Sequence, residues 1–229
     1  MRDIEKRIQK LERNIAKEIE MEERRKTMGT KKYAETDGIK KINLILRGMP
    51  ETPLVIHAFA EKAKQEIRDK QQKKAKKVHE GRKPLEESEA AKYFDEAGRE
   101  CAPITAVKKA IITAATAFKD LTKVGLRQAI FVRPQDGYGL LVPIEKYDGS
   151  AAVGAMREDA VTIGINTRGL TYRPEYKEWQ LRVSIEYNSR IVSEEQLLAL
   201  VDQAGWGVGI CEGRPERSSA LGWGRFIRA

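Results

Sequence analysis

The hydrophobic positions at the start of the chain repeat with the period of an α-helix. Apolar residues recur in steps of three or four, with charged residues between them, at Ile4, Ile8, Leu11, Ile15 and Ile19. This spacing places them on one face of an amphipathic helix over about the first 25 residues. A helix with so narrow an apolar face is marginal alone in water. We therefore expect it to dock onto its own domain or onto a neighbouring subunit.

Other segments show the patterns of strands and of more deeply buried helices. Strands are predicted by β-branched or alternating runs at residues 41–47, 127–132, 139–144, 160–163, 170–173 and 179–187. Helices are predicted over residues 53–77, where Pro53 is the first position, 86–98, where Gly98 is the stop, and 103–115, which is rich in alanine. Short strands mixed with helices predict an α+β protein.

The last strand and helix form the clearest unit. The strand from Trp179 to Tyr187 alternates apolar and polar residues, as a half-buried strand must. Ser193 and Gln196 have the spacing of a capping box at the start of a helix, which ends at Gly205. Residues 208–211 are expected to form the returning strand. Strand, helix and strand at these lengths predict a ferredoxin-like (RRM-like) core.

The domain organisation follows from these elements. Residues 1–38 are expected to form the amphipathic helical arm and a polar linker. Residues 39–229 are expected to form the α+β domain, interrupted at about 61–99 by a basic helical insertion. The alternating charges of the first residues are unlike a signal peptide, and no apolar run approaches the ~20 residues that span a bilayer. We expect a cytoplasmic protein.

Positive charge is concentrated in the predicted insertion. The chain of 229 residues carries 43 Lys and Arg against 34 Asp and Glu, a net charge of +9. Between Glu61 and Lys83 there are ten Lys and Arg against four Asp and Glu, which is two thirds of the net charge. This run is either a solvated helix face or an arm that contacts phosphates. Its candidate contacts are Lys73, Lys74, Lys76 and Lys77.

Glycine, arginine and tryptophan gather in the last 25 residues. Six of the 18 glycines lie there with four arginines and two tryptophans, in the segments 205–209, 213–217 and 222–226. Glycine tolerates φ > 0 and close backbone approach, and an interleaved arginine adds positive charge beside backbone N–H groups. This chemistry suits phosphate or sugar. The alternative is a hairpin or bulge that closes the last sheet.

Three segments together resemble the RAMP superfamily, which includes backbone subunits of CRISPR effector complexes and endoribonucleases that process CRISPR transcripts. The Gly222-Trp223-Gly224-Arg225-Phe226 element is similar to the superfamily's glycine-rich C-terminal loop. Residues 102–111 resemble its early helix start, with Thr105, Ala106 and Lys109 where the superfamily has Gly or Ser. Residues 179–211 fit its ferredoxin-like core. The resemblance implies binding of single-stranded RNA along an oligomeric assembly.

These observations define a set of candidate contacts to nucleic acid. Besides the four insertion lysines, it contains residues from the helix start, the basic and aromatic run before Trp179 and the C-terminal segment: Lys108, Lys109, Arg168, Arg173, Gly207, Gly209, Arg214, Arg217, Gly222, Gly224 and Arg225. Bases stack on aromatic rings and arginine planes, and phosphates bind nearby cations. We expect a non-catalytic protein that binds single-stranded nucleic acid, RNA before DNA, and that contacts another protomer or partner protein through its N-terminal helix.

No cofactor or metal is expected. There is no phosphate-binding P-loop, and the two cysteines, Cys101 and Cys211, lie in different sequence contexts and suggest neither a zinc site nor a disulfide framework. Of the two histidines, His57 lies within an apolar run and His79 within the basic run. Two alternatives stay open. One is a phage structural or assembly protein whose terminal segments make protein contacts, and the other is a metal-independent endoribonuclease that uses His57.

Overall fold

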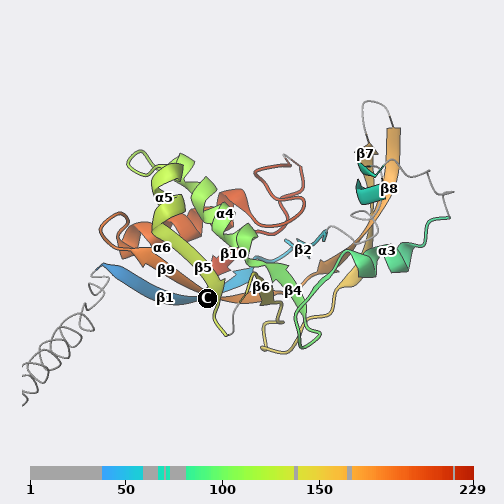
Figure 1. Ribbon diagram of the computed structural model, residues 1–229, viewed down its shortest axis with the longest axis horizontal. Coiled ribbons are helices and arrows are strands. Elements are labelled where there is room, and N and C mark those ends of the chain that lie inside the picture. Colours follow the sequence, from blue (N-terminus) through green and yellow to red (C-terminus); the bar gives the residue numbers. More distant parts are fainter. Residues whose placement is uncertain are drawn as a thin grey trace, which may run out of the picture. The chain divides into compact units, whose positions relative to one another are not determined.

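Four strands form the central sheet of the computed structural model, in the order β10-β1-β9-β5. Their bounds are β1 (Ile39–Gly48), β5 (Ile130–Pro134), β9 (Gln180–Asn188) and β10 (Phe226–Arg228). Helices α4 (Ile104–Ala114) and α6 (Glu194–Gln203) lie on the same side of this sheet (Figure 1). Along the chain the order is β1-α4-β5-β9-α6-β10, and in space the fourth strand lies beside the first. This is ferredoxin-like topology, and the predicted α+β fold is confirmed.

The described residues are 38–58, 67–69, 71–72, 81–136, 139–163, 167–218 and 220–229. The chain divides into two compact units, Met1–Ile39 and Lys40–Ala229, and nearly all described residues belong to the second. The predicted amphipathic helix and linker, over residues 1–37, lie outside the described part of the chain. So do the predicted contacts Lys73, Lys74, Lys76 and Lys77 and the second histidine, His79.

Two three-stranded sheets are inserted into the central topology. One has the order β2-β8-β7 and the other β3-β4-β6. Their bounds are β2 (Leu54–Val55), β3 (Tyr93–Phe94), β4 (Glu100–Pro103), β6 (Leu141–Pro143), β7 (Ala155–Ile163) and β8 (Thr167–Tyr176). Strands β7 and β8 form a long antiparallel pair, from Ala155 opposite Glu175 to Ile163 opposite Thr167. Helix α3 (Pro84–Ala90) packs against this pair.

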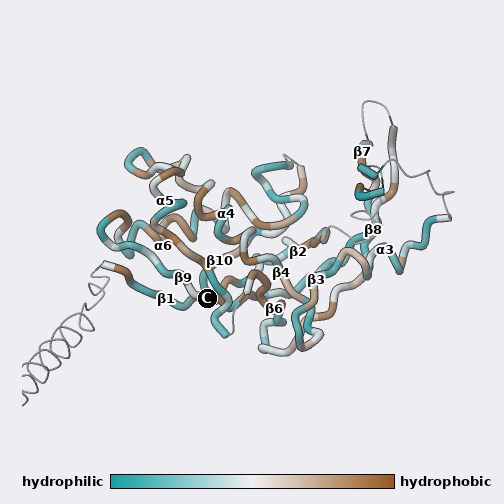
Figure 2. Tube along the Cα trace, in the orientation of Figure 1, coloured by the Kyte–Doolittle hydropathy of each residue, from teal (hydrophilic) through white to brown (hydrophobic). Residues whose placement is uncertain are grey.

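The core lies between the central sheet and its two helices. Helix α4 buries one apolar face against the sheet, and α6 buries Leu197, Leu200 and Val201. Ser193 and Gln196 form the predicted capping box, which satisfies N–H groups at the start of α6. Hydrophobic colour follows α4, α6 and the strands beneath them in Figure 2. The largest fully buried side chains include Trp179, Tyr176, Tyr187, Phe226 and Leu46.

The predicted helix from Pro53 is wrong at its start. Leu54 and Val55 instead form strand β2, which pairs with Tyr176 and Glu175 of β8. Leu54, Val55 and Ile56 are almost fully buried in succession. Consecutive apolar residues suit an extended segment that is covered on both sides, and such a run cannot be told from a buried helix by pattern alone. Residues 67–69 are helical, and the intervening part of the predicted helix lies outside the described residues.

Three further boundaries differ from the prediction. Val208 ends a π-helical turn and residues 209–211 form a loop, and the strand that returns beside β1 is Phe226–Arg228. Residues 127–129 belong to helix α5 (Lys123–Ala129), whose first turn is capped by the Thr122 side chain, so β5 begins only at Ile130. The helix predicted to Gly98 ends at Ala90, and Gly98, with φ of 75°, occupies the turn between β3 and β4.

Candidate nucleic-acid interface

A pocket of about 290 Å³ lies between helix α4 and the glycine-rich loop that joins α6 to β10. One wall comes from α4 and the residue before it, and another from residues 208–216 of the loop. The remaining lining comes from Ile56 and His57, which follow β2, and from Tyr93 of β3. The side chains with polar or ionisable groups at its surface are His57, Tyr93, Thr105, Lys109, Thr113, Cys211, Glu212, Arg214 and Glu216.

Helix α4 turns one polar strip toward this pocket. Thr105, Lys109 and Thr113 are four residues apart, so they lie on one face of the helix, and all three line the pocket. Lys109 is exposed and makes no ion pair within the described part of the chain. Because an unpaired ammonium keeps its full charge available, Lys109 is the cation of this wall best able to bind an anion.

Lys108, the other lysine predicted on this helix, does not line the pocket. Its ammonium lies 4.4 Å from the centre of the Phe131 ring and donates a hydrogen bond to the Arg127 carbonyl, at 3.3 Å. Successive residues of a helix point about 100° apart, so the side chains of Lys108 and Lys109 lie on different surfaces of the domain. The structure therefore separates the two predicted contacts.

The glycines of the loop are required by its geometry. Gly209, Gly213, Gly222 and Gly224 all have φ between 63° and 70°, a region that other residues rarely adopt. A Cβ on Gly224 would lie 2.0 Å from the Ile210 carbonyl oxygen. Gly207 is exposed and has ordinary φ. These positions explain the glycines through chain packing and turn geometry.

Backbone hydrogen bonds tie the loop to the rest of the domain. The N–H of Ile210 donates to the Gly224 carbonyl at 3.0 Å, so the two arms of the loop are joined. The N–H groups of Glu212 and Gly224 donate to the carbonyls of Val55 and Pro53, at 3.1 and 2.9 Å. The loop is thus a fixed wall of the pocket, and the N–H groups of Ile210, Glu212 and Gly224 are engaged by backbone carbonyls.

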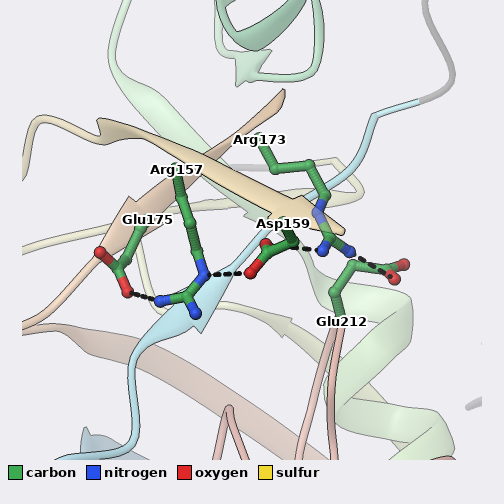
Figure 3. A network of polar contacts seen from close by, with 5 residues as sticks. All are labelled: Arg157, Asp159, Arg173, Glu175 and Glu212. Atoms are coloured by element: carbon green, nitrogen blue, oxygen red, sulfur yellow. Dashed lines mark hydrogen bonds and ion pairs between the residues drawn. The ribbon is translucent and has the colours of Figure 1, made fainter. Parts of the chain in front are cut away.

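A network of ion pairs fastens the β7–β8 pair to the loop (Figure 3). The guanidinium of Arg173 contacts Asp159 at 2.7 Å and Glu212 of the loop at 3.3 Å, and Arg157 contacts Asp159 and Glu175. Arg173 is only 7% exposed. A cation so buried between carboxylates has little surface left for a phosphate. Arg173 was a predicted contact, and we now assign it to the support of the loop.

The other predicted arginines differ in how much charge they leave available. Arg214 pairs with Glu216 at 3.0 Å and donates to the Cys211 carbonyl, so it is fixed in the pocket wall. Arg217 is mostly exposed and reaches the same carboxylate only at 3.8 Å. Arg225 has no carboxylate partner among the described residues and stacks on Trp206. Arg168 lies on β8 opposite Thr162, and its side chain is outside the described part.

The pocket therefore brings together Lys109, Gly209 and Arg214 from the predicted set, with His57 beside them. Sequence analysis assigned no contact role to Trp206 or Thr105, although both are exposed and belong to the two segments that meet here. The helical spacing of Thr105 and Lys109 would have indicated the threonine. Exposure of Trp206 has no signal in the sequence, because Trp223 also stands between two glycines and is buried.

Thiol chemistry is disfavoured in this pocket. Burial, together with the neighbouring Glu212 charge, raises the pKa of the Cys211 thiol to about 12. Burial also raises the pKa of Cys101, to about 11. Since the thiolate is the nucleophile and the metal ligand, both groups are inert at neutral pH. The described residues contain no cluster of three His, Cys, Asp or Glu side chains that is able to hold a metal ion.

The fold defines an α+β protein with a ferredoxin-like core. No protein family and no curated protein matches the sequence. The structure is similar to the crystal structure of Cmr6 from Pyrococcus furiosus, with 10% sequence identity, a TM-score of 0.37, and coverage of 83% of this chain and 99% of that chain. At these values the two chains share a distant likeness. Within the described ranges, none of the helices combines the length and the apolar character needed to cross a bilayer.

Proposed function

We propose that this protein binds single-stranded nucleic acid, RNA before DNA, without cleaving it, as a subunit of an oligomeric ribonucleoprotein. The observation that carries the proposal is the convergence of the helix start at residues 103–113 and the glycine-rich loop on one pocket. These two segments lie about 100 residues apart in the sequence. The first overlaps residues 102–111, which resemble the RAMP superfamily, and the second belongs to the glycine-rich region that ends in the similar element from Gly222 to Phe226. Lys109, an exposed residue of the first segment, lies in the pocket wall.

The charge in the pocket that favours an anionic ligand is Lys109. Its two carboxylates already have cationic partners, because Glu212 pairs with Arg173 and Glu216 with Arg214. Lys109 is unpaired within the described residues and offers one free cation, in a lining where two cations, Lys109 and Arg214, balance the two carboxylates. The net charge of +9 acts in the same direction at longer range. The insertion lysines, Lys73 to Lys77, extend the proposed phosphate contacts, and the N-terminal helix is the proposed contact to a neighbouring subunit.

Substitution of Lys109 tests the pocket. We expect Lys109→Gln to reduce the salt dependence of RNA binding by ~0.7 log units per log unit of salt, since one phosphate contact on a single strand is lost. At about 0.1 M salt this corresponds to roughly fivefold weaker binding. Filter binding of a labelled single-stranded RNA across a range of salt concentrations measures both quantities.

Lys108→Gln is the matched control, because it removes the same charge from the neighbouring position of the same helix. Its ammonium is engaged by Phe131 and Arg127 outside the pocket, so its salt dependence should stay close to that of the wild type. Equal losses for the two variants would indicate a general effect of charge and would contradict a site in the pocket. Wild-type binding that does not change with salt would contradict the proposed function.

One observation favours a second candidate, a metal-independent endoribonuclease. His57 is exposed and lines the same pocket as Lys109, so a bound strand would pass beside an imidazole that is able to move a proton. This candidate predicts that the wild type shortens a labelled RNA in the presence of a chelator and that His57→Ala abolishes the cleavage. The non-catalytic proposal predicts that the RNA stays intact with both proteins.

A further inference from the structure

One aromatic side chain of the glycine-rich region is unusually exposed. Trp206 is 63% exposed, whereas the other two tryptophans, Trp179 and Trp223, are 0% and 7% exposed. Tryptophan is largely buried in most proteins, since its ring removes a large apolar area from water. The exposed indole of Trp206 is therefore a candidate contact for a ligand or a partner.

Arg225 holds this indole in a defined arrangement. The guanidinium carbon lies 4.1 Å from the centre of the Trp206 ring, and Nε donates a hydrogen bond to the Trp206 carbonyl at 3.0 Å. The Arg225 carbonyl in turn accepts hydrogen bonds from the Met49 N–H and the Thr52 hydroxyl, both at 3.0 Å. The arginine is thus fixed at both ends, and one face of the ring is covered by a planar cation.

The backbone beneath the pair is also fixed. Trp206 lies in a π-helical turn, Ala204–Val208, that ends α6. Gly205 is so close to β10 that a Cβ there would lie 2.0 Å from the Phe226 carbonyl oxygen. The turn also leads directly into Val208 and Gly209, which line the proposed binding pocket. The indole therefore stands on a rigid support at the start of the pocket's loop wall.

We infer that the Trp206–Arg225 pair is a stacking platform for a nucleobase of the bound strand. With the guanidinium on one face, the opposite face of the ring is left for a flat π system. The cation increases the attraction for a ligand that carries phosphate, and stacking accepts any base. The inference rests on the proposed function and adds to it a contact to the base, where Lys109 contacts the phosphate.

A protein partner is the less favoured occupant. Tryptophan anchors in protein interfaces are typically enclosed on both faces by an apolar pocket of the partner. Here a charged group already occupies one face, and burial of that pair in an apolar pocket would require the arginine to lose its hydration without a carboxylate to replace it. A planar base is able to stack while the guanidinium stays in contact with water.

Fluorescence and affinity test the platform on the full chain. Because Trp206 is the single exposed indole, we expect single-stranded RNA to quench the red-edge emission of the wild type. We expect Trp206→Ala to weaken binding roughly 5- to 150-fold, the range that corresponds to loss of one stacked base. Trp206→Phe keeps an aromatic face and should retain most of the affinity. A strand of the same length with abasic sites should bind the wild type and Trp206→Ala equally.

The outcomes separate this inference from the proposed function. If the wild type binds RNA but Trp206→Ala binds equally well and no quenching occurs, the platform is wrong and the proposed function stands. If Trp206→Ala weakens the intact and the abasic strand by the same factor, the residue does not stack on a base, and the platform is also wrong. If the wild type binds neither strand, both ideas fail. Circular dichroism of each variant verifies that it is folded.

Discussion

Gly224→Ala is expected to destabilise the protein by about 3–5 kcal/mol. The new Cβ would force a residue with φ of 64° into a region unfavourable for alanine and would meet the Ile210 carbonyl oxygen at 2.0 Å. A left-handed conformation and overpacking each cost about 1–3 kcal/mol. The Ile210 carbonyl belongs to backbone and cannot move aside without disturbing the loop. Urea unfolding followed by circular dichroism measures the loss.

Gly222→Ala is a matched control for that variant. Gly222 has nearly the same φ, 65°, but a Cβ there would meet only Cδ of Arg225, at 3.9 Å, an ordinary van der Waals contact. It should therefore cost about 1–2 kcal/mol, the penalty for the left-handed conformation alone. Equal losses at the two positions would contradict the close packing of the loop. Small losses at both would mean that the glycine-rich segment is mobile and would also contradict its close packing.

Glu100→Gln is expected to cost about 3 kcal/mol, because it removes the buried charge partner of the buried Lys92 ammonium and leaves only the exposed Glu89. Glu100 begins β4 and accepts hydrogen bonds from the Lys92 ammonium at 3.0 Å, the Tyr176 hydroxyl at 2.7 Å and the Gly154 N–H at 2.8 Å. The side chains of Lys92 and Glu100 are only 3% and 10% exposed. This cluster joins two of the small sheets. Thermal unfolding measures the change.

Glu89→Gln is the control for this pair. Glu89 contacts the same ammonium at 2.6 Å, but its side chain is 62% exposed, so its loss should cost no more than about 1 kcal/mol. Equal effects of the two substitutions would show that burial does not strengthen the contact with Glu100. A loss in Glu89→Gln larger than in Glu100→Gln would contradict the arrangement of the cluster.

The same carboxylate makes stability depend on pH. Burial opposes ionisation of Glu100, but its hydrogen bonds with Tyr176, Gly154 and Lys92 outweigh burial and lower its pKa from the ordinary 4.5. A lowered pKa in the folded state stabilises the fold above pH 4.5, and this contribution is lost as the pH falls through the folded value. The stability gap between wild type and Glu100→Gln should therefore narrow on acidification below pH 4.5.

The elements that were predicted correctly are those determined by residues close together in the sequence. The alternation from Trp179 to Tyr187 matches β9, and the Ser193–Gln196 capping box forms as expected. Helix α4 follows the apolar pattern of residues 103–115 closely. Side-chain periodicity and capping act within a few residues, so each is visible without knowledge of the tertiary fold.

The parts that were missed depend on long-range pairing. Strand β2 exists because Leu54 and Val55 pair with β8 more than 100 residues away, and β10 takes the place beside β1 that was expected for residues 208–211. The same holds for the site. Arg173 and Lys109 looked alike as isolated cations, but the fold buries Arg173 between carboxylates and leaves Lys109 in the pocket. Neither the burial of Arg173 nor the exposure of Lys109 is visible in the residues that surround each of them in the sequence.

The glycine-rich loop has both a structural role in packing and a place in the wall of the pocket. Its glycines close the central sheet and let the loop pack tightly, as a purely structural segment would. The shape they impose also forms one wall of the pocket and supports the exposed Trp206. Under the proposed function, a rigid loop that presents one aromatic ring and few free cations would make ordered contacts with a few nucleotides.

Equilibrium binding of one RNA sequence, as a single strand and annealed to its complement, tests the central proposal most directly. The pocket and the exposed indole require unpaired bases and a flexible backbone, so the full chain should bind the single strand more tightly, with an affinity that falls steeply as salt is added. Equal binding of both forms, or no binding of either at low salt, would contradict the account.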